Sequence, residues 1–109
     1  MGDRNIVCFN SVDVVRTAYY PGIQIADGSY NEVVNNTVSN CEEGITVETM
    51  LTNESSYNHV AYNHIENMAK YVVMVSGAGD VGNVIEYNTF IGSRVIIDRG
   101  TDTVIRHNS

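Results

Sequence analysis

A repeated pair of asparagines constrains the fold of this chain more than any other feature of the sequence. Asn5 and Asn10 lie five residues apart, and equivalent pairs follow at steps of 26, 27, 25 and 20 residues. The later pairs are Asn31 and Asn36, Asn58 and Asn63, Asn83 and Asn88, and Thr103 and Asn108, in which threonine takes the first position. A repeat of this length is typical of a solenoid, in which each unit packs only on its neighbours.

Each unit contains three short segments that favour β-strands. Val or Ile follows the first position by two residues, and Val, Ile or Phe follows the second position by two residues in the first four units. A third segment lies at 22–25, 44–47, 71–74 and 95–97. Strands this short bury little alone, but stacked units pair each strand with its equivalents about 4.8 Å away. We therefore predict an all-β, right-handed parallel β-helix of about four rungs, beginning near Asn5, Asn31, Asn58 and Asn83.

Other repeat folds fit the sequence less well. Leucine-rich repeats need several leucines per unit, and this chain has only Leu51. No long window shows the 3.6-residue period of an amphipathic helix. Residues 1–109 are expected to form one β-helix domain that is a fragment of a longer solenoid. The residues predicted to point inward are Val7, Val12, Ile23, Ile25, Val33, Val38, Ile45, Val47, Val60, Ile65, Val72, Met74, Ile85 and Phe90.

The second asparagine of each pair is predicted to have a structural role. A sharp corner between two strands needs a residue near the left-handed region, which Asn adopts at lower cost than most residues. Stacked amides can also bond to one another along the repeat. We expect a structural Asn ladder, with these asparagines at the corners: Asn10, Asn36, Asn63, Asn88 and Asn108.

The repeat Asn-x-Val-x-x-Asn-x-Val, followed by Gly-Ile-x-Val, resembles the parallel β-helix repeat of pectate-lyase-like proteins. That group includes polysaccharide lyases and hydrolases, alginate epimerases, periplasmic copper-delivery proteins and phage tailspikes. The resemblance extends from Asn5 to Asn108. It implies the fold but not one function, because members share the repeat and differ at their sites. Members commonly have more rungs and an N-terminal capping helix, which residues 1–4 are too short to form.

Charge and composition limit the partners and the location. The formal net charge is −7, and Lys70 is the single lysine. Nucleic acids and anionic membranes attract clustered Lys and Arg, so neither is expected as a partner. The N-terminal residues do not resemble a signal peptide. By the resemblance, we expect an extracellular or virion-surface protein with a polysaccharide partner and no cofactor.

No complete catalytic or metal-binding set is evident. Glycosidases need two carboxyl groups at a defined separation. Asp27, Glu48, Asp80 and Asp98 lie near the ends of predicted strands, but no two adjacent units repeat an acid in one column. A lyase would need a base such as Arg94 or Arg99 opposite an acid cluster. The histidines (His59, His64 and His107) and the two cysteines (Cys8 and Cys41) occupy unlike positions, so no metal site is predicted. Enzyme activity remains open, and the catalytic residues are unknown.

Aromatic residues suggest where a ligand would bind. Phe9, Tyr62 and Tyr87 share one rung position and are expected to stack on one another. Tyr19 and Tyr20 lie in an inserted segment, where exposed rings could contact a sugar, although a loop folded over the solenoid wall is the alternative. We interpret the chain as a noncatalytic carbohydrate-recognising module. The alternatives are part of a polysaccharide lyase, hydrolase or epimerase, and a structural or engineered solenoid without a ligand.

The ends of the solenoid are the last feature of interest. An uncapped rung exposes unpaired backbone groups and the apolar interior, which invite pairing with another chain. Neither residues 1–4 nor the residues after Asn108 resemble a cap. We therefore expect self-association through the rung ends, either head-to-tail or as a two-fold pair.

Overall fold

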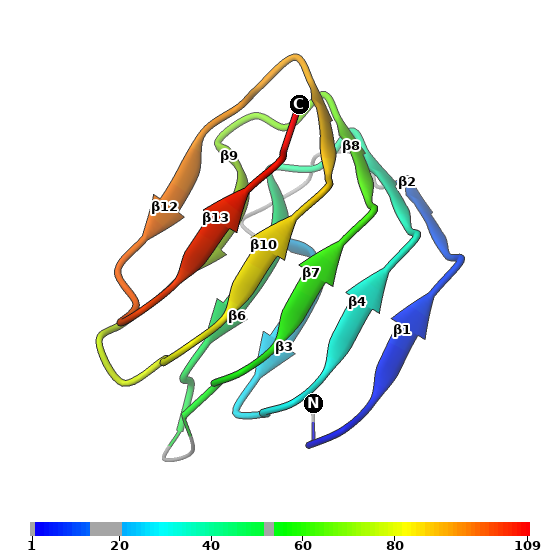
Figure 1. Ribbon diagram of the computed structural model, residues 1–109. Coiled ribbons are helices and arrows are strands. Elements are labelled where there is room, and N and C mark those ends of the chain that lie inside the picture. The colour runs from blue at the N-terminus through cyan, green and yellow to red at the C-terminus, as the bar shows by residue number, and fades with distance from the viewer. Residues whose placement is uncertain (1, 14–20, 52–53) are drawn as a thin grey trace.

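The computed structural model describes residues 2–13, 21–51 and 54–109 as a coil of short parallel strands (Figure 1). Each of three sheets takes one strand from every complete turn of the coil, and one of the sheets also contains the last strand of the chain. The described part of the chain contains no helix long and apolar enough to cross a membrane. This architecture confirms the predicted right-handed parallel β-helix of about four rungs.

The three sheets form the walls of the coil, and every pairing between their strands is parallel. Sheet A contains β1 (Ile6–Cys8), β4 (Glu32–Val34), β7 (His59–Ala61), β10 (Val84–Glu86) and β13 (Val104–Arg106). Sheet B contains β2 (Ser11–Asp13), β5 (Thr37–Ser39), β8 (His64–Glu66) and β11 (Thr89–Ile91). Sheet C contains β3 (Pro21–Ala26), β6 (Glu43–Glu48), β9 (Tyr71–Val75) and β12 (Ile96–Asp98).

The core is a set of apolar columns that run along the solenoid axis. Val33, Val60 and Ile85 are in register on sheet A, and all three are fully buried. Equivalent columns line sheets B and C, so in-register strands place like residues above one another. Of the predicted inward residues, all but one belong to the core cluster or pack against it.

Met74 is the exception, and its predicted inward position is wrong. The pairing aligns Ile45 with Val73 and Val47 with Val75, so Val73 and Val75 point inward and are fully buried. Met74 pairs with Thr46 and lies on the outer face. Aligning the segment 71–74 with 44–47 was off by one residue, and a one-residue slip reverses the face of every side chain in a strand.

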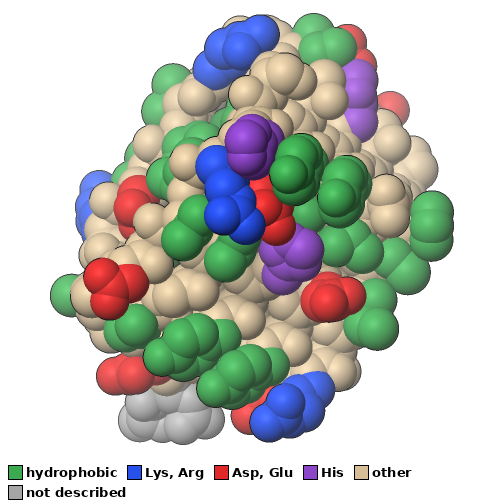
Figure 2. Space-filling view, viewed as in Figure 1, with side chains coloured by type: hydrophobic (Ala, Val, Ile, Leu, Met, Phe, Trp, Pro, Cys, Tyr) green, Lys and Arg blue, Asp and Glu red, His purple; other side chains and the backbone are tan. Residues whose placement is uncertain are grey.

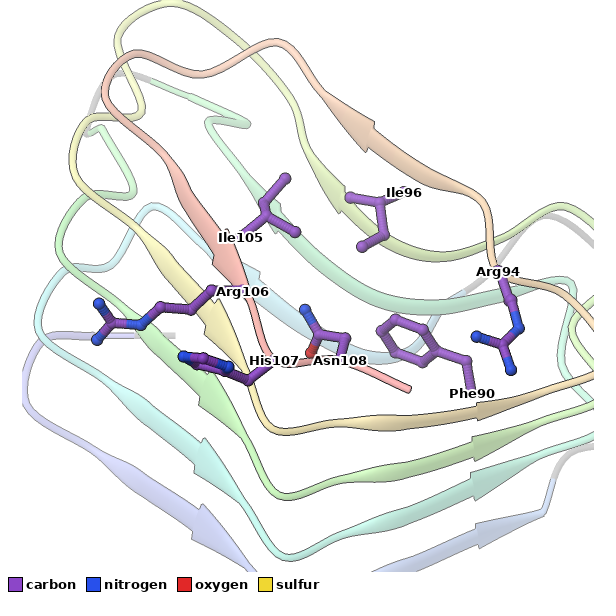
Figure 3. Close-up of a pocket in the computed structure, with 7 residues that line it drawn as sticks. All are labelled: Phe90, Arg94, Ile96, Ile105, Arg106, His107 and Asn108. Carbon is purple, nitrogen blue, oxygen red and sulfur yellow. The ribbon is translucent and has the colours of Figure 1, made fainter.

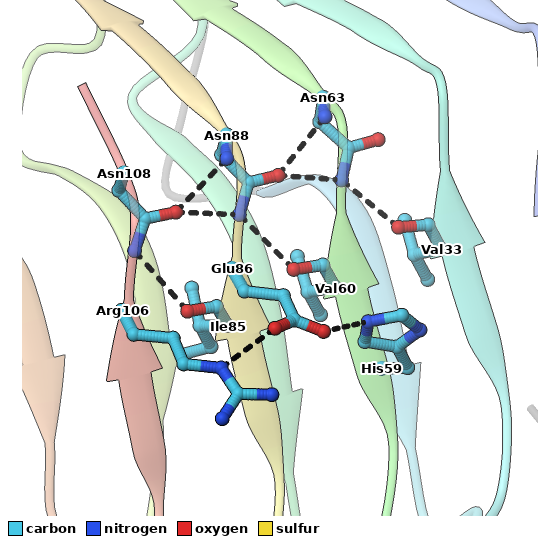
Figure 4. Close-up of polar contacts among 9 residues, drawn as sticks. All are labelled: Val33, His59, Val60, Asn63, Ile85, Glu86, Asn88, Arg106 and Asn108. Atoms are coloured by element: carbon cyan, nitrogen blue, oxygen red, sulfur yellow. Dashed lines mark hydrogen bonds and ion pairs between the residues drawn. The ribbon is translucent and has the colours of Figure 1, made fainter.

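Two columns of asparagine bind successive rungs together. In the predicted column, the amide oxygen of Asn63 accepts from the Asn36 backbone N–H at 2.9 Å and from its Nδ2 at 3.1 Å. Asn63 Nδ2 in turn donates to Asn88 Oδ1 and to the Val33 carbonyl, at 3.0 and 2.9 Å (Figure 4). The same pattern links Asn10 to Asn36 and Asn88 to Asn108.

The first asparagines of the pairs form a second column, which the sequence interpretation missed. The Asn31 backbone N–H donates to Asn58 Oδ1 at 2.9 Å, and the Asn58 N–H donates to Asn83 Oδ1 at the same distance. These three side chains are fully buried. Their burial is tolerated because the amides bond to one another and to backbone carbonyls.

The left-handed residue at each corner is the one before the asparagine, which corrects our prediction. Positive φ angles of 54–56° occur at Phe9, Asn35, Tyr62, Tyr87 and His107. None of the asparagines in the two columns has a positive φ among the described residues. The turn is made one residue earlier, so that the asparagine side chain can point inward and bond to the next rung.

Candidate functional site

The outer face of sheet A carries a charged group that spans three strands. Glu86 Oε2 lies 2.7 Å from His59 Nε2, and Arg106 Nε donates to Glu86 Oε1 at 2.8 Å (Figure 4). Arg106 first and His59 second lower the pKa of the Glu86 carboxyl below its ordinary value, because both hydrogen-bond to it. The Arg106 side chain remains 55% exposed. Its guanidinium can therefore contact a ligand while it holds Glu86.

Two columns of aromatic rings border this face, one at each end of the strands. Tyr62 stacks on Tyr87 with ring centroids 5.3 Å apart, and His107 stacks on Tyr87 at 5.0 Å. At the other end, Tyr30 stacks on Tyr57 at 5.3 Å, and the Arg4 guanidinium lies 4.8 Å from the Tyr30 centroid. The expected stacking is thus confirmed for Tyr62 and Tyr87, whereas Asn35 separates Phe9 from them in the column.

We call this surface the sheet A wall: His59, Glu86 and Arg106, with Tyr30 and Tyr57 on one side and Tyr62, Tyr87 and His107 on the other. Figure 2 views it directly and shows acidic, basic and histidine side chains in contact, with hydrophobic side chains beside and below them. The stacked rings cover one another's faces. The tyrosines, about half exposed, therefore offer ring edges and hydroxyl groups to a ligand.

A pocket of about 320 Å³ lies on the outside of sheet C. We call it the sheet C pocket, and it is lined by Pro21, Gln24, Glu43, Glu48, Met50, Tyr71 and Met74. Gln24 Nε2 donates to Glu48 Oε1 at 2.7 Å, and Lys70 Nζ lies 4.0 Å from Glu43 Oε1. Burial, then a hydrogen bond to Glu43, raises the pKa of the Tyr71 phenol. Tyr71 therefore stays protonated, and its hydroxyl hydrogen-bonds to the Glu43 side chain.

A second hollow, of about 300 Å³, lies at the end of the coil formed by β12 and β13. Figure 3 shows Phe90, Ile96 and Ile105 pointing into the interior from three sides, with Asn108 among them. Arg94, Arg106 and His107 complete the lining. This hollow is the open end of the apolar core.

Three of the four acids considered for catalysis support loops instead. The buried Asp80 accepts from Thr49 Oγ1, the Ser55 N–H, Ser76 Oγ and the Gly77 N–H at 2.7–3.1 Å. Asp27 accepts from the backbone N–H groups of Met50 and Leu51. Asp98 accepts from the Gly100 backbone N–H and from the Thr103 hydroxyl, Oγ1. Glu48 lines the sheet C pocket, where its neighbouring acid is Glu43. The lyase, hydrolase and epimerase alternative thus gains no supporting geometry.

Metal-binding side chains do not gather in the described residues, which include every His, Cys, Asp and Glu of the chain. No group of three or more such side chains could hold a metal ion there. Cys41 is buried in the core, and Cys8 lies on sheet A. The two predicted sugar contacts, Tyr19 and Tyr20, lie outside the described residues.

Comparison with known proteins gives one match. A family model described as "Periplasmic copper-binding protein (NosD)" matches residues 3–109. Among curated proteins and solved structures, none matches the chain. The match supports a parallel β-helix of a periplasmic family, but it does not single out the pectate-lyase-like group.

Proposed function

Because the chain belongs to the NosD family of periplasmic β-helix proteins, we propose that it is a noncatalytic binding module whose sheet A wall recognises a carbohydrate. The family's periplasmic description agrees with a location outside the cytoplasm, and nothing in the comparisons favours a virion surface.

The observation that carries this proposal is the charged group held between two exposed tyrosine columns. The sheet A wall has five strands spaced about 4.8 Å apart, so it extends roughly 19 Å along the solenoid axis. That width suits a short oligosaccharide. Phenol hydroxyls at both edges and the His59–Glu86–Arg106 group between them offer donors and acceptors that match sugar hydroxyls.

Arg106 also suggests the class of sugar. A guanidinium binds a carboxylate through two parallel hydrogen bonds, and only its Nε is used by Glu86. An acidic sugar, such as a uronate, would place its carboxylate on the remaining guanidinium nitrogens. Neutral sugars would lack this contact and bind more weakly.

We expect the 109-residue chain to bind oligouronates more tightly than neutral oligosaccharides in calorimetric titrations. Arg106→Gln should weaken uronate binding by about tenfold or more, since a charge-assisted hydrogen bond contributes about 1.5–3 kcal/mol. Tyr87→Phe, which keeps the ring stack and removes the hydroxyl, should weaken it less. Arg94→Gln is the matched control because Arg94 lines the end hollow and not the wall. Equal binding by wild type and Arg106→Gln, or no saccharide binding at all, would contradict the proposal.

We also propose that the 109-residue polypeptide associates head-to-tail through its terminal rungs. In both columns, backbone and amide N–H groups donate to the asparagine of the next rung toward the C-terminus. The first rung therefore presents Asn10 Oδ1, and the last presents the Asn108 backbone N–H. Head-to-tail stacking joins donor to acceptor, whereas a two-fold pair would place like groups together. Head-to-tail stacking would also cover the side chain of Ile105, which is 42% exposed.

Light scattering across a range of concentrations tests this association. We expect the mean mass to rise with concentration and Ile105→Lys to suppress the rise by placing a charge in the apolar contact. Ile91→Lys, at an exposed side-wall position, is the control. A monomer at every concentration would overturn the proposal.

A further inference from the structure

We propose that an acidic oligosaccharide on the sheet A wall lies along the solenoid axis and seats one sugar ring on Asn35, between the rings of Phe9 and Tyr62. This inference rests on the proposed carbohydrate function and adds a second contact point for the same ligand. It concerns the residues that turn the chain from sheet A to sheet B in successive rungs (Figure 1). We call them the corner column: Phe9, Asn35, Tyr62, Tyr87 and His107.

Asn35 leaves a gap in the rings of the corner column. The Phe9 backbone N–H donates to the Asn35 carbonyl at 3.1 Å, and the Asn35 N–H donates to the Ala61 carbonyl at 3.3 Å, so Asn35 lies one rung from each ring. Rungs about 4.8 Å apart separate the Phe9 and Tyr62 positions by about 9.6 Å. The Tyr62 and Tyr87 centroids are 5.3 Å apart. Because Asn is shorter than Tyr, the outer part of the gap can hold one further ring at a similar spacing.

Phe9 borders this gap in an unusual conformation for its residue type. Its side chain is 80% exposed, and its φ is 54°. A bulky residue adopts this left-handed conformation at a free-energy cost that Asn or Gly largely avoids. Tyr62 and Tyr87 offset part of that cost by stacking on each other, whereas no ring in the described part of the chain stacks on Phe9. The Phe9 ring is therefore free to offer an apolar face to the C–H groups of a sugar.

Asn35 supplies the polar contacts at the base of the gap. Its side chain is exposed, and no hydrogen bond to another described residue occupies its amide. The adjacent Asn36 differs, because its amide links the rungs by bonds to Asn10 and Asn63. A free amide offers an acceptor oxygen and an NH₂ donor, which match neighbouring hydroxyls of a sugar. The gap thus combines apolar faces on two sides with a polar base, as a pyranose ring requires.

The position of Asn35 relative to Arg106 determines the direction of the ligand. Asn35 directly follows β4, and Arg106 belongs to β13, three strands further along sheet A. Three strand spacings make about 14 Å along the solenoid axis. A single sugar cannot reach both residues. An oligosaccharide that runs along the axis can place a carboxylate on Arg106 and a ring on Asn35, and it passes the exposed edges of Tyr62 and Tyr87 between them.

Calorimetric titration of the dilute 109-residue chain with a monomeric uronate and with a longer oligouronate tests this orientation. The main variant is Asn35→Tyr, which introduces the residue that the next two rungs carry as Tyr62 and Tyr87. The added ring should complete the stack and close the gap, so circular dichroism should show a folded protein. We expect Asn35→Tyr to lose tenfold or more in affinity for the longer oligouronate. It should keep the wild-type affinity for the monomer, which Arg106 alone holds.

A second variant, Phe9→Leu, removes the other ring without filling the gap and should weaken only the longer oligouronate, by several-fold. Ile91→Ala, at an exposed apolar position on sheet B, is the control and should bind like wild type.

The outcomes separate this inference from the function on which it rests. Unchanged or tighter binding of the longer oligouronate by Asn35→Tyr and Phe9→Leu, with a loss in Arg106→Gln, would overturn the Asn35 contact and leave the carbohydrate function standing. Equal affinity of the wild type for monomer and longer oligouronate would do the same. The absence of any saccharide binding would overturn both proposals.

Discussion

Replacement of Asn63 by alanine is expected to lower the free energy of unfolding by about 4 kcal/mol. The change removes the acceptor for the Asn36 N–H and the donor to the Val33 carbonyl, at 2.9 Å each. Both groups are buried, and each one left without a partner costs about 1–3 kcal/mol. A solenoid contacts only neighbouring rungs, so a break in the middle of the column also weakens cooperativity along the coil.

Urea unfolding followed by circular dichroism measures this loss. Asn10→Ala is the matched control because Asn10 occupies the same column at its exposed end. We expect it to cost less than about 1 kcal/mol, as for a solvent-accessible hydrogen bond. If the two variants lost equal stability, the column would not be the link that holds the rungs.

Replacement of Gly44 by valine is expected to have an effect of similar or larger size. A Cβ at position 44 would overlap the Val72 carbonyl oxygen and lie 2.9 Å from its carbon. These are backbone atoms of the adjacent strand, so a side-chain movement cannot relieve the clash. Forced overpacking usually costs about 1–3 kcal/mol, and separating β6 from β9 adds to it. We expect a loss of about 3 kcal/mol or more in thermal or urea unfolding.

Gly77→Ala is the matched control for this glycine. A Cβ there meets no atom within 4 Å, so little change in stability is expected. Gly44→Val with wild-type stability would show that sheet C is not packed as closely as the structure describes.

The repeat was sufficient to predict the fold and most of the core, because in-register strands place equivalent residues above one another. The prediction was wrong at positions where a shift of one residue in the alignment changes which face of a strand a side chain lies on, or which residue forms a corner. Met74 was placed inward because Val72 was aligned with Ile45 instead of Gly44. The left-handed corner was assigned to Asn10 and its equivalents, although the preceding residue adopts it. The first asparagine column was missed, although its sequence signal differs from that of the second column only by Thr103 in the last unit.

The candidate sites were less accessible to prediction for a similar reason. Glu86 and Arg106 are register partners. Their ion pair could therefore have been predicted from the sequence, because an acid and a base occupy the same column of the repeat in successive units. His59 joins them diagonally, from a position that pairs with Val84. The sheet C pocket depends on Met50, which is positioned by Asp27 across the coil. The hydrogen bond between Asp27 and Met50 does not recur in the described residues of the other units, so the repeat pattern does not predict it.

The central claim is that this β-helix binds its ligand on the sheet A wall, and NMR shift mapping tests it most directly. The labelled 109-residue chain would be titrated with an oligouronate. The proposal predicts shifts confined to His59, Glu86, Arg106 and the tyrosine columns, with sheet C unchanged. Shifts centred on another surface, or no shifts at saturating saccharide, would contradict it.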